Sequence, residues 1–476
     1  MSSQQPNMIY IVADQWRGDC LGIYKNHHPV MTPHLNQLAC EGVNYRHGYA
    51  DCPICMPQRA TMLTGKTGSQ TRCITNFDTN SAPEIDPSRT LPGRLTKEAG
   101  YQTKAIGKMH FVPQRARHGF EHVTLHPDDY LWWLEEQGQG GSFRGHGLGG
   151  NEVYPTEAVT DQRYYHTTWI IDQAIRFLEQ RDPANPFFLY IIFEAPHSPF
   201  DPPPPYDRMY DNFTIPAPVE GNWRENDYPA SFEAKRIGGK YDYMQPEAIA
   251  EARRRYYGQM SHIDYQLGRL FGSLRSHGID DQTAIAFTSD HGECLGDHGI
   301  FAKHNFLESA ARVPFILRLP PQFREQYQTA QADTPVLTAD LCPTFLNMAG
   351  LTPDRTTEGQ SLLQASQREF IFGETPESAM ILGRGYKFIY YIAGGNEQLF
   401  NIHQDSDDRE NLAHSADFAS IQAELKAKLI DYLTHNKSPM VKDGALVNQP
   451  VNIDTDWLRR MNPCACRGPM HGGDGY

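Results

Sequence analysis

Short apolar runs alternate with amphipathic segments along most of the chain. Six runs have the length and composition of buried strands, at residues 8–13, 104–107, 187–193, 283–289, 315–319 and 370–372. The segments 33–41, 94–99, 164–180 and 248–276 carry apolar residues three and four positions apart, as helices do. Strands that alternate with helices predict an α/β fold with a doubly wound, mostly parallel sheet flanked by helices.

The pattern changes after residue 350. Residues 386–392 and 398–402 are separated by Gly394-Gly395, which predicts an antiparallel hairpin, and an amphipathic helix follows at 418–434. We therefore expect an α/β catalytic domain over residues 1–350 and a small α+β domain with an antiparallel sheet over 351–435. The polar tail 436–476 is a candidate arm for contact with a second subunit, which would make a homo-oligomer.

Two irregular stretches interrupt the alternation of strands and helices. Residues 137–155 are rich in glycine, and residues 201–246 are rich in proline and aromatic residues. Long loops of this kind often form the rim of a binding site. The aromatic residues of the second stretch, with Trp132 and Trp133, either line a pocket for a sugar or aryl ring or only pack the loops.

The overall charge restricts the partners that the protein can bind. The 476 residues carry 43 basic and 57 acidic side chains, a formal net charge of -14. This balance repels nucleic acid and anionic membranes at long range, so we expect neither as a partner, and any anion site must be a local basic pocket. The apolar run 187–193 is too short to span a bilayer, and residues 2–7 are polar rather than signal-like. We expect a cytoplasmic protein, or a periplasmic one if a signal was removed.

The nine cysteines are odd in number and widely spaced, so most are expected to be reduced. Cys52-x-x-Cys55 is a candidate redox pair or, with Cys464-Ala-Cys466, a candidate zinc site. The distance between the two pairs is unlike that of compact zinc modules.

Acidic residues follow two of the predicted strands. Asp14 ends the first strand, and Asp290-His291 ends the strand at 283–289. The carboxyl ends of parallel strands are where α/β sheets bind ligands, so these side chains are expected to converge and hold a hard divalent cation. Taken singly, each segment also fits an aspartate that caps a helix beside a structural histidine.

The segment Cys55-Met-Pro-Gln-Arg59-Ala-Thr-Met-Leu-Thr-Gly65 resembles the signature of the sulfatase family, whose cysteine is oxidised to formylglycine. That family, within the alkaline-phosphatase superfamily, has the strand-end acidic residues and this segment in the same order, and the resemblance extends to about residue 435. It implies an alkaline-phosphatase-like fold and a metal held by Asp14, Asp290, His291 and the modified Cys55. It also implies a formylglycine-generating enzyme as a partner during maturation.

Some positions depart from the common family pattern. Gln58 stands where serine is usual, Gln15 where many sulfatases have a second aspartate, and His291 where they have asparagine. Asp-Gln with Asp-His is similar to phosphonate monoester hydrolases and to some bacterial aryl and choline sulfatases. The resemblance implies Ca²⁺ as the metal, with Mn²⁺ or Mg²⁺ as alternatives.

Two short motifs resemble family elements that carry cations and proton donors. Gly107-Lys108-Met-His110 resembles a Gly-Lys-x-His element, which implies that Lys108 binds the sulfuryl oxygens and that His110 steadies the nucleophile. Glu194-Ala-Pro-His197-Ser-Pro resembles a Pro-His-x-Pro element, which implies that His197 gives a proton to the leaving group. A solvent-facing lysine and a structural histidine in a proline turn are the ordinary alternatives.

The remaining candidates bind substrate by resemblance alone. Lys303 matches the lysine that follows the metal pair and is expected to clamp the anion together with Arg59. Asn76 is similar to a substrate-contacting asparagine of the phosphonate hydrolases, although it also fits an ordinary turn, and Gln15 is a further candidate for substrate contact.

These residues predict a sulfuric ester hydrolase that acts on the sulfate ester of a small molecule or saccharide. A hydrated aldehyde at position 55 offers one hydroxyl for attack at sulfur and a second one to drive release of sulfate. A phosphonate monoester or phosphate diester is the alternative substrate for the same site. A binding protein in which Cys55 remains a thiol is the alternative from another class.

Overall fold

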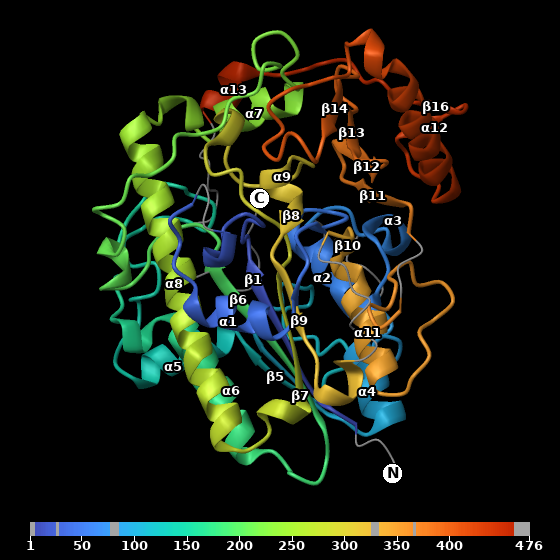
Figure 1. Cartoon of the computed structure of the whole chain (residues 1–476). Coiled ribbons are helices and arrows are strands. Elements are labelled where there is room, and N and C mark those ends of the chain that lie inside the picture. The colour runs from blue at the N-terminus through green and yellow to red at the C-terminus, as the bar shows by residue number, and fades with distance from the viewer. Residues whose placement is uncertain (1–4, 25–27, 77–84, 325–332, 365–367, 461–476) are drawn as a thin grey trace.

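The computed structural model describes residues 5–24, 28–76, 85–324, 333–364 and 368–460. A seven-stranded sheet with the order β2-β9-β7-β1-β6-β4-β5 forms its centre (Figure 1). β7, β1, β6, β4 and β5 are parallel, whereas β9 runs antiparallel to β7 and β2 antiparallel to β9. The strands are β1 Asn7–Asp14, β2 Val43–Asn44, β4 Gln102–Gly107, β5 His122–Leu125, β6 Phe187–Pro196, β7 Thr283–Ser289 and β9 Phe315–Arg318.

Helices cover both faces of this sheet, which confirms the predicted doubly wound α/β architecture (Figure 1). One face packs against α1 Pro33–Glu41, α6 His166–Gln180 and α8 Pro246–Ser276. The other packs against α2 Cys55–Thr64, α4 Leu91–Ala99 and α11 Leu341–Met348.

The central strand β1 shows why polar chemistry is confined to the strand ends. Successive side chains of a strand point to opposite faces, so Tyr10 lies in one core and Ile11 in the other, both fully buried. With both faces covered, the interior of β1 must be apolar throughout. Its first charged side chain, Asp14, comes at the carboxyl end.

A second sheet lies at one end of the molecule and is antiparallel, with the order β11-β12-β13-β14 (Figure 1). Its strands are β11 Phe370–Glu374, β12 Ser378–Gly383, β13 Tyr386–Tyr391 and β14 Glu397–Asn401, and α12 Ala419–His435 packs on one face. The predicted hairpin and helix are confirmed. The assignment of 370–372 to the main sheet is wrong, because this run pairs with β12, a strand that the sequence did not reveal.

Shorter elements complete the described chain. β3 Gly48–Tyr49 lies between β10 Val336–Leu337 and β8 Arg312–Val313, and β15 Val441–Lys442 pairs with β16 Ala445–Leu446. The remaining helices are α3 Gly68–Thr71, α5 Asp128–Glu136, α7 Ala230–Gly238, α9 Glu308–Ala311 and α13 Thr455–Arg460.

Part of the C-terminal tail packs against its own chain. α13 lies beside α7, where the Lys240 ammonium donates to the backbone oxygen of Leu458 and Arg459 pairs with Asp242 at 3.0 Å. The contact with a second subunit and the domain limits at 350 and 435 therefore stay predictions.

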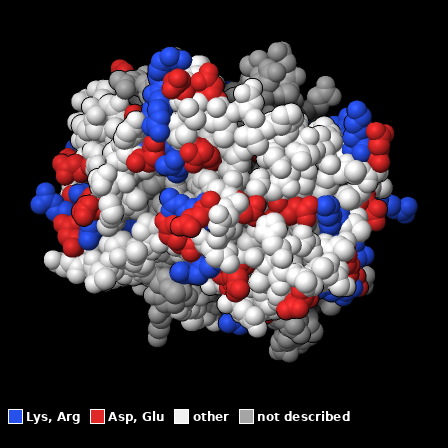
Figure 2. All heavy atoms as spheres, turned by 90° about the horizontal axis from the view of Figure 1, so that it is seen from above, with Lys and Arg blue, Asp and Glu red and all other residues white. Residues whose placement is uncertain are grey.

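The face of the molecule that lies at the top of Figure 1 carries both positive and negative side chains. Lysine and arginine lie beside aspartate and glutamate in small clusters, separated by wide uncharged areas (Figure 2). No helix within the described ranges is both long and apolar enough to cross a membrane.

Candidate active site

The pairing of β1 with β7 brings two aspartates side by side. Ala13 lies opposite Ser289 in this parallel pair, so the next residues, Asp14 and Asp290, leave the sheet at the same edge. Both carboxylates are fully buried. Their convergence at the carboxyl end of the sheet is the arrangement that the sequence predicted.

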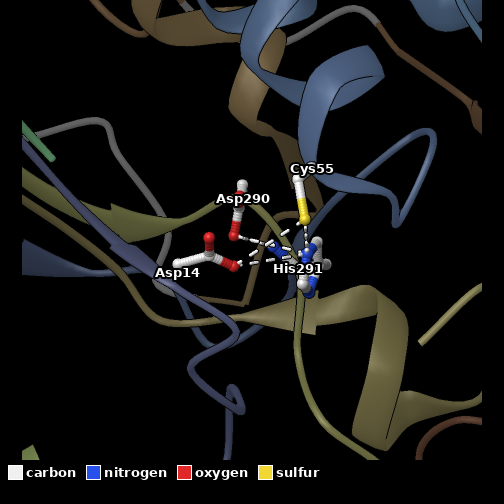
Figure 3. Close-up of side chains that lie close together, drawn as sticks. All are labelled: Asp14, Cys55, Asp290 and His291. Atoms are coloured by element: carbon white, nitrogen blue, oxygen red, sulfur yellow. Dashed lines mark hydrogen bonds and ion pairs between the residues drawn. The ribbon is translucent and has the colours of Figure 1, made fainter. Parts of the chain in front are cut away.

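Cys55 reaches the same point from α2, of which it is the first residue. Its Sγ lies 3.1 Å from Nε2 of His291 and 3.9 Å from Oδ1 of Asp14. The four side chains point toward one another (Figure 3), and their ligand-type atoms all lie within 4.8 Å of each other. The structure thus brings the predicted nucleophile and the three predicted metal ligands into one buried cluster.

This grouping argues against a zinc site built on Cys52 and Cys55. The Sγ of Cys55 faces the aspartates and His291, whereas the Sγ of Cys52 contacts the backbone oxygen of Ile74 at 3.8 Å. Cys464 and Cys466 lie outside the described residues.

Arg59 lies one helical turn after Cys55 and bridges the two aspartates. Its Nη2 is 2.9 Å from Oδ2 of Asp14 and 2.9 Å from Oδ2 of Asp290, and its Nε is 3.1 Å from the latter oxygen. Burial opposes the charged form, but Asp290 and Asp14 outweigh it and raise the pKa of Arg59 above its ordinary value. One oxygen of each carboxylate is thereby occupied.

The other oxygen of each carboxylate faces His291. Nε2 of His291 lies 3.6 Å from Oδ1 of Asp14 and 3.7 Å from Oδ1 of Asp290. Its Nδ1 lies 3.0 Å from the backbone oxygen of Gly292, which assigns the ring proton to Nδ1 and the lone pair to Nε2. Burial lowers the pKa of His291, so the neutral imidazole that metals require is favoured.

The donor set fits a divalent cation. Burial raises the pKa of Asp14, but the positive charges of Lys108 and other neighbours outweigh it and hold that pKa well below its ordinary value. A carboxylate oxygen from each aspartate and an imidazole nitrogen therefore converge on one point. Hard divalent cations favour this oxygen-rich set.

Lys108 follows β4 and enters the cluster from the other side of β6. Its Nζ lies 3.0 Å from Oδ2 of Asp14 and 3.9 Å from Oε1 of Glu194. Only 5% of the residue is exposed. Lys108 is therefore buried beside Asp14 and does not face solvent.

A second group forms around Lys303. Its Nζ donates to Oε1 of Gln15 at 2.6 Å and lies 2.7 Å from Nε2 of His197. The Gln15 amide donates in turn to Glu293, whose pKa is raised by burial. Nδ1 of His197 lies 2.9 Å from the backbone oxygen of Ser198, so Nε2 is the atom that meets the lysine.

Two candidates are less closely tied to the nucleophile. Oδ1 of Asn76 accepts from the backbone N–H of Met56 at 2.9 Å, so this side chain caps the start of α2. His110 is buried in a left-handed backbone conformation with φ 54°, and its Nδ1 has no hydrogen-bond partner among the described residues. The substrate contact of Asn76 and the role of His110 stay predictions.

Several charged residues of the site escaped the sequence analysis. Glu194 belongs to a motif that was singled out only for His197, and Arg144 carries no motif at all. Glu194, His126 and His166 also have ligand-type atoms within 4.8 Å of each other. Arg144 and Lys108 already pair with Glu194, so a second metal ion there would face two positive charges at close range.

Of the tryptophans considered for a pocket, Trp223 is buried, and its indole N–H donates to the backbone oxygen of Asp408 at 2.8 Å, so it packs the loops. Trp133 packs beside Tyr130, and Trp132 is exposed.

Cys55 at the start of α2 meets Asp14, Asp290 and His291 at the carboxyl ends of the central strands, which is where α/β folds place their active sites. The chain belongs to the sulfatase family, because the Sulfatase family profile matches residues 6–351. The enzyme is a sulfuric ester hydrolase.

Individual relatives agree with this assignment. An arylsulfatase of Clostridium perfringens is 31% identical over 452 residues, which cover 87% of this chain and 91% of the relative. A choline-sulfatase of Rhizobium meliloti is 28% identical over 90% of this chain and 86% of its own length. The crystal structure of a phosphonate monoester hydrolase of Agrobacterium radiobacter has the same fold, with a TM-score of 0.73 and 24% identity over 94% of this chain and all of the other.

Proposed function

We propose that Cys55 is converted to formylglycine and that the enzyme hydrolyses a sulfate ester to an alcohol and inorganic sulfate with the help of one divalent metal ion. The position of Cys55 carries this proposal, because its Sγ lies 3.1 Å from His291 and 3.9 Å from Asp14. A side chain at this position is buried beside groups that can bind a metal ion, where a nucleophile would be useful.

Asp14, Asp290, His291 and the modified side chain at 55 would hold the metal. A bound divalent cation would lower the pKa of the hydrated aldehyde and offset charge on the transferred group. Ca²⁺ is our choice, because two carboxylates supply hard oxygen ligands, with Mn²⁺ and Mg²⁺ as alternatives. The hydrated aldehyde supplies one hydroxyl for attack at sulfur and a second whose deprotonation expels sulfate and restores the carbonyl.

The buried cations supply the charge that an anionic substrate needs. Arg59 and Lys108 both contact Asp14, and Lys303 lies within the same site on the opposite side, so we assign all three to binding the sulfuryl oxygens. Gln15 holds Lys303 and is a candidate for direct contact with the substrate.

Two histidines are given different roles, one in proton transfer and one in orientation of the nucleophile. Nε2 of His197 lies 2.7 Å from the ammonium of Lys303, so the neutral ring accepts a hydrogen bond there. To act on the leaving group, Nε2 would first take a proton from Lys303 or from water, and the resulting imidazolium would give that proton to the leaving oxygen. We assign His110 to the orientation of the nucleophile, in keeping with its position two residues beyond Lys108. Asn76 is kept as a candidate substrate contact.

The substrate is proposed to be the sulfate ester of a small molecule or a saccharide. The names of the relatives, an arylsulfatase and a choline-sulfatase, support this class without selecting one alcohol. A phosphonate monoester or phosphate diester is the competing substrate, since Asp14-Gln15 with Asp290-His291 is similar to phosphonate monoester hydrolases.

The deciding experiment combines mass spectrometry with kinetics on protein made with a formylglycine-generating enzyme. The tryptic peptide that contains Cys55 should show replacement of the thiol by an aldehyde, and aryl sulfate should be cleaved faster than aryl phosphonate once Ca²⁺ is supplied. The variant Cys55→Ala should be inactive on both. Faster phosphonate cleavage would replace the proposed substrate, and an unmodified, inactive thiol would favour a binding protein.

A further inference from the structure

The ammonium group of Lys108 lies between two carboxylates that belong to different strands. Asp14 ends β1 and lies 3.0 Å from Nζ, and Glu194 is near the end of β6 and lies 3.9 Å away. The first of these carboxylates is shared with Arg59. Of the two carboxylates beside Lys108, Glu194 is therefore the one that is neither a proposed metal ligand nor a partner of Arg59.

Glu194 is itself fixed from several sides. Its Oε1 accepts from Nη2 of Arg144 at 2.6 Å, and its Oε2 lies 3.5 Å from Nε2 of His126. The side chains of Glu194 and Arg144 are 8% and 6% exposed. Burial alone would raise the pKa of Glu194, but Arg144, His126 and Lys108 outweigh it and lower that pKa to about 2. The carboxylate is thus charged wherever the enzyme is folded under ordinary conditions.

Arg144 comes from the glycine-rich stretch 137–155 that the sequence marked as a rim. The same stretch is held to the segment after β6 at two further points. His146 pairs with Asp201 at 3.1 Å, and the Ser198 hydroxyl donates to the backbone oxygen of Gly150 at 3.0 Å. The loop that carries Arg144 therefore contacts the chain before His197, at Glu194, and after it, at Ser198 and Asp201.

We propose that Glu194 is a positioning residue that fixes the ammonium of Lys108 against the substrate anion, and that Arg144 holds Glu194 in place. A lysine side chain is a flexible four-carbon chain that ends in a single point charge, so contact with one carboxylate leaves the direction of the ammonium group loosely defined. A second carboxylate, held by the planar guanidinium of Arg144, restricts the direction of that ammonium group. This proposal rests on the proposed function, since it assigns the purpose of Lys108 within that site.

The test uses the full-length, formylglycine-containing enzyme with saturating metal and compares Glu194→Gln and Arg144→Gln with wild type. Glu194→Gln keeps the shape of the side chain and removes its charge. We expect kcat to fall by about 10- to 100-fold with a smaller change in KM, because a misplaced cation stabilises developing charge poorly. Arg144→Gln should act in the same direction, and Arg144→Lys should recover part of the loss.

A matched control is available at the opposite end of the sheet. Arg318 is also mostly buried and pairs with Asp280 at 2.9 Å, close to the amino end of β7. Arg318→Gln should lower the midpoint of thermal unfolding while kcat per formylglycine stays within twofold of wild type.

Three outcomes separate the explanations. The inference is overturned if Glu194→Gln and Arg144→Gln keep kcat within twofold of wild type, or if their losses only follow the folded fraction, as in Arg318→Gln. If Glu194→Gln does not fold, the comparison of Arg144→Gln with Arg144→Lys decides in its place. A wild type that cleaves phosphonate but not sulfate contradicts the proposed substrate alone, and the same variants are then compared on phosphonate.

Discussion

Replacement of Arg59 by lysine tests the centre of the site. The guanidinium joins Asp14 and Asp290 through three hydrogen bonds of 2.9 to 3.1 Å, and its remaining nitrogen donates to the backbone oxygen of Lys108. An ammonium on a shorter reach can keep the positive charge but cannot bridge both carboxylates and the backbone at once. The substitution therefore removes geometry while it retains charge.

The size of the effect follows from the bonds lost. Hydrogen bonds to charged groups contribute about 1.5 to 3 kcal/mol each. If lysine preserves one of the three carboxylate bonds, two are lost, which is about 3 to 6 kcal/mol. Each 1.36 kcal/mol corresponds to a factor of ten, so kcat/KM should fall by about 150- to 25,000-fold.

The assay is hydrolysis of an aryl sulfate, with rates divided by the formylglycine content of each preparation. That correction matters because Arg59 lies in the segment that resembles the sulfatase signature, so the substitution would also change how much of Cys55 the proposed formylglycine-generating enzyme converts. Arg94→Lys, on α4 and paired with Glu98 at 2.7 Å, is the control that makes the same substitution in a more exposed ion pair away from the site. A kcat/KM for Arg59→Lys within threefold of wild type, at equal formylglycine content, would refute the reasoning.

Three further predictions test the metal, a buried acid and the loop before α2. Chelation should abolish activity and lower the unfolding midpoint, and Ca²⁺ at 100 times its dissociation constant should restore about 2.7 kcal/mol of stability, as calorimetry with and without the ion can show. Burial raises the pKa of Asp264 to about 7, so ionisation of this carboxyl group destabilises the folded protein as pH rises from about 4 to 7. The free energy of unfolding of wild type relative to Asp264→Asn, measured by urea unfolding, should therefore fall by up to about 4 kcal/mol over that pH range. A pH-independent difference would contradict this. Gln58→Ser should lose the bonds to Asp51 and Cys52 and about 2 kcal/mol of stability, with kcat per formylglycine unchanged.

The main sheet was predictable because its strands are buried on both faces. Such strands are continuous apolar runs, and residues 283–289 were delimited without error. Short strands with mixed composition escaped: β5, at His122–Leu125, is partly exposed and polar, and β2 has only two residues. The run at 370–372 was too short to show which sheet it joins, because only its pairing with β12 decides that.

The buried cluster of Asp14, Cys55, Asp290 and His291 was predictable for a related reason. A charged residue directly after a buried strand must lie at the sheet edge, and β1 and β7 are neighbours. Nothing local places Arg144 beside Glu194, fifty residues along the chain, since that contact depends on the path of an irregular loop. Partners of this kind are set by tertiary structure, and single-sequence patterns do not contain them.

The site gathers basic side chains in a protein that is acidic overall. Around the nucleophile, the carboxyl groups of Asp14, Asp290, Glu194 and Glu293 lie among the basic side chains of Arg59, Lys108, Arg144 and Lys303. Arg59 engages Oδ2 of each aspartate, while Oδ1 of each faces His291. Oδ1 of Asp290 also accepts from the backbone N–H groups of Gln15 and His291. A chain of net charge -14 thus holds four basic side chains in a buried site, where low dielectric strengthens the attraction of each one for an anion. Glu194 is the second carboxylate beside Lys108, and it is held by Arg144. In the proposal above, this carboxylate orients the ammonium group of Lys108, and the guanidinium of Arg144 balances the negative charge that it adds.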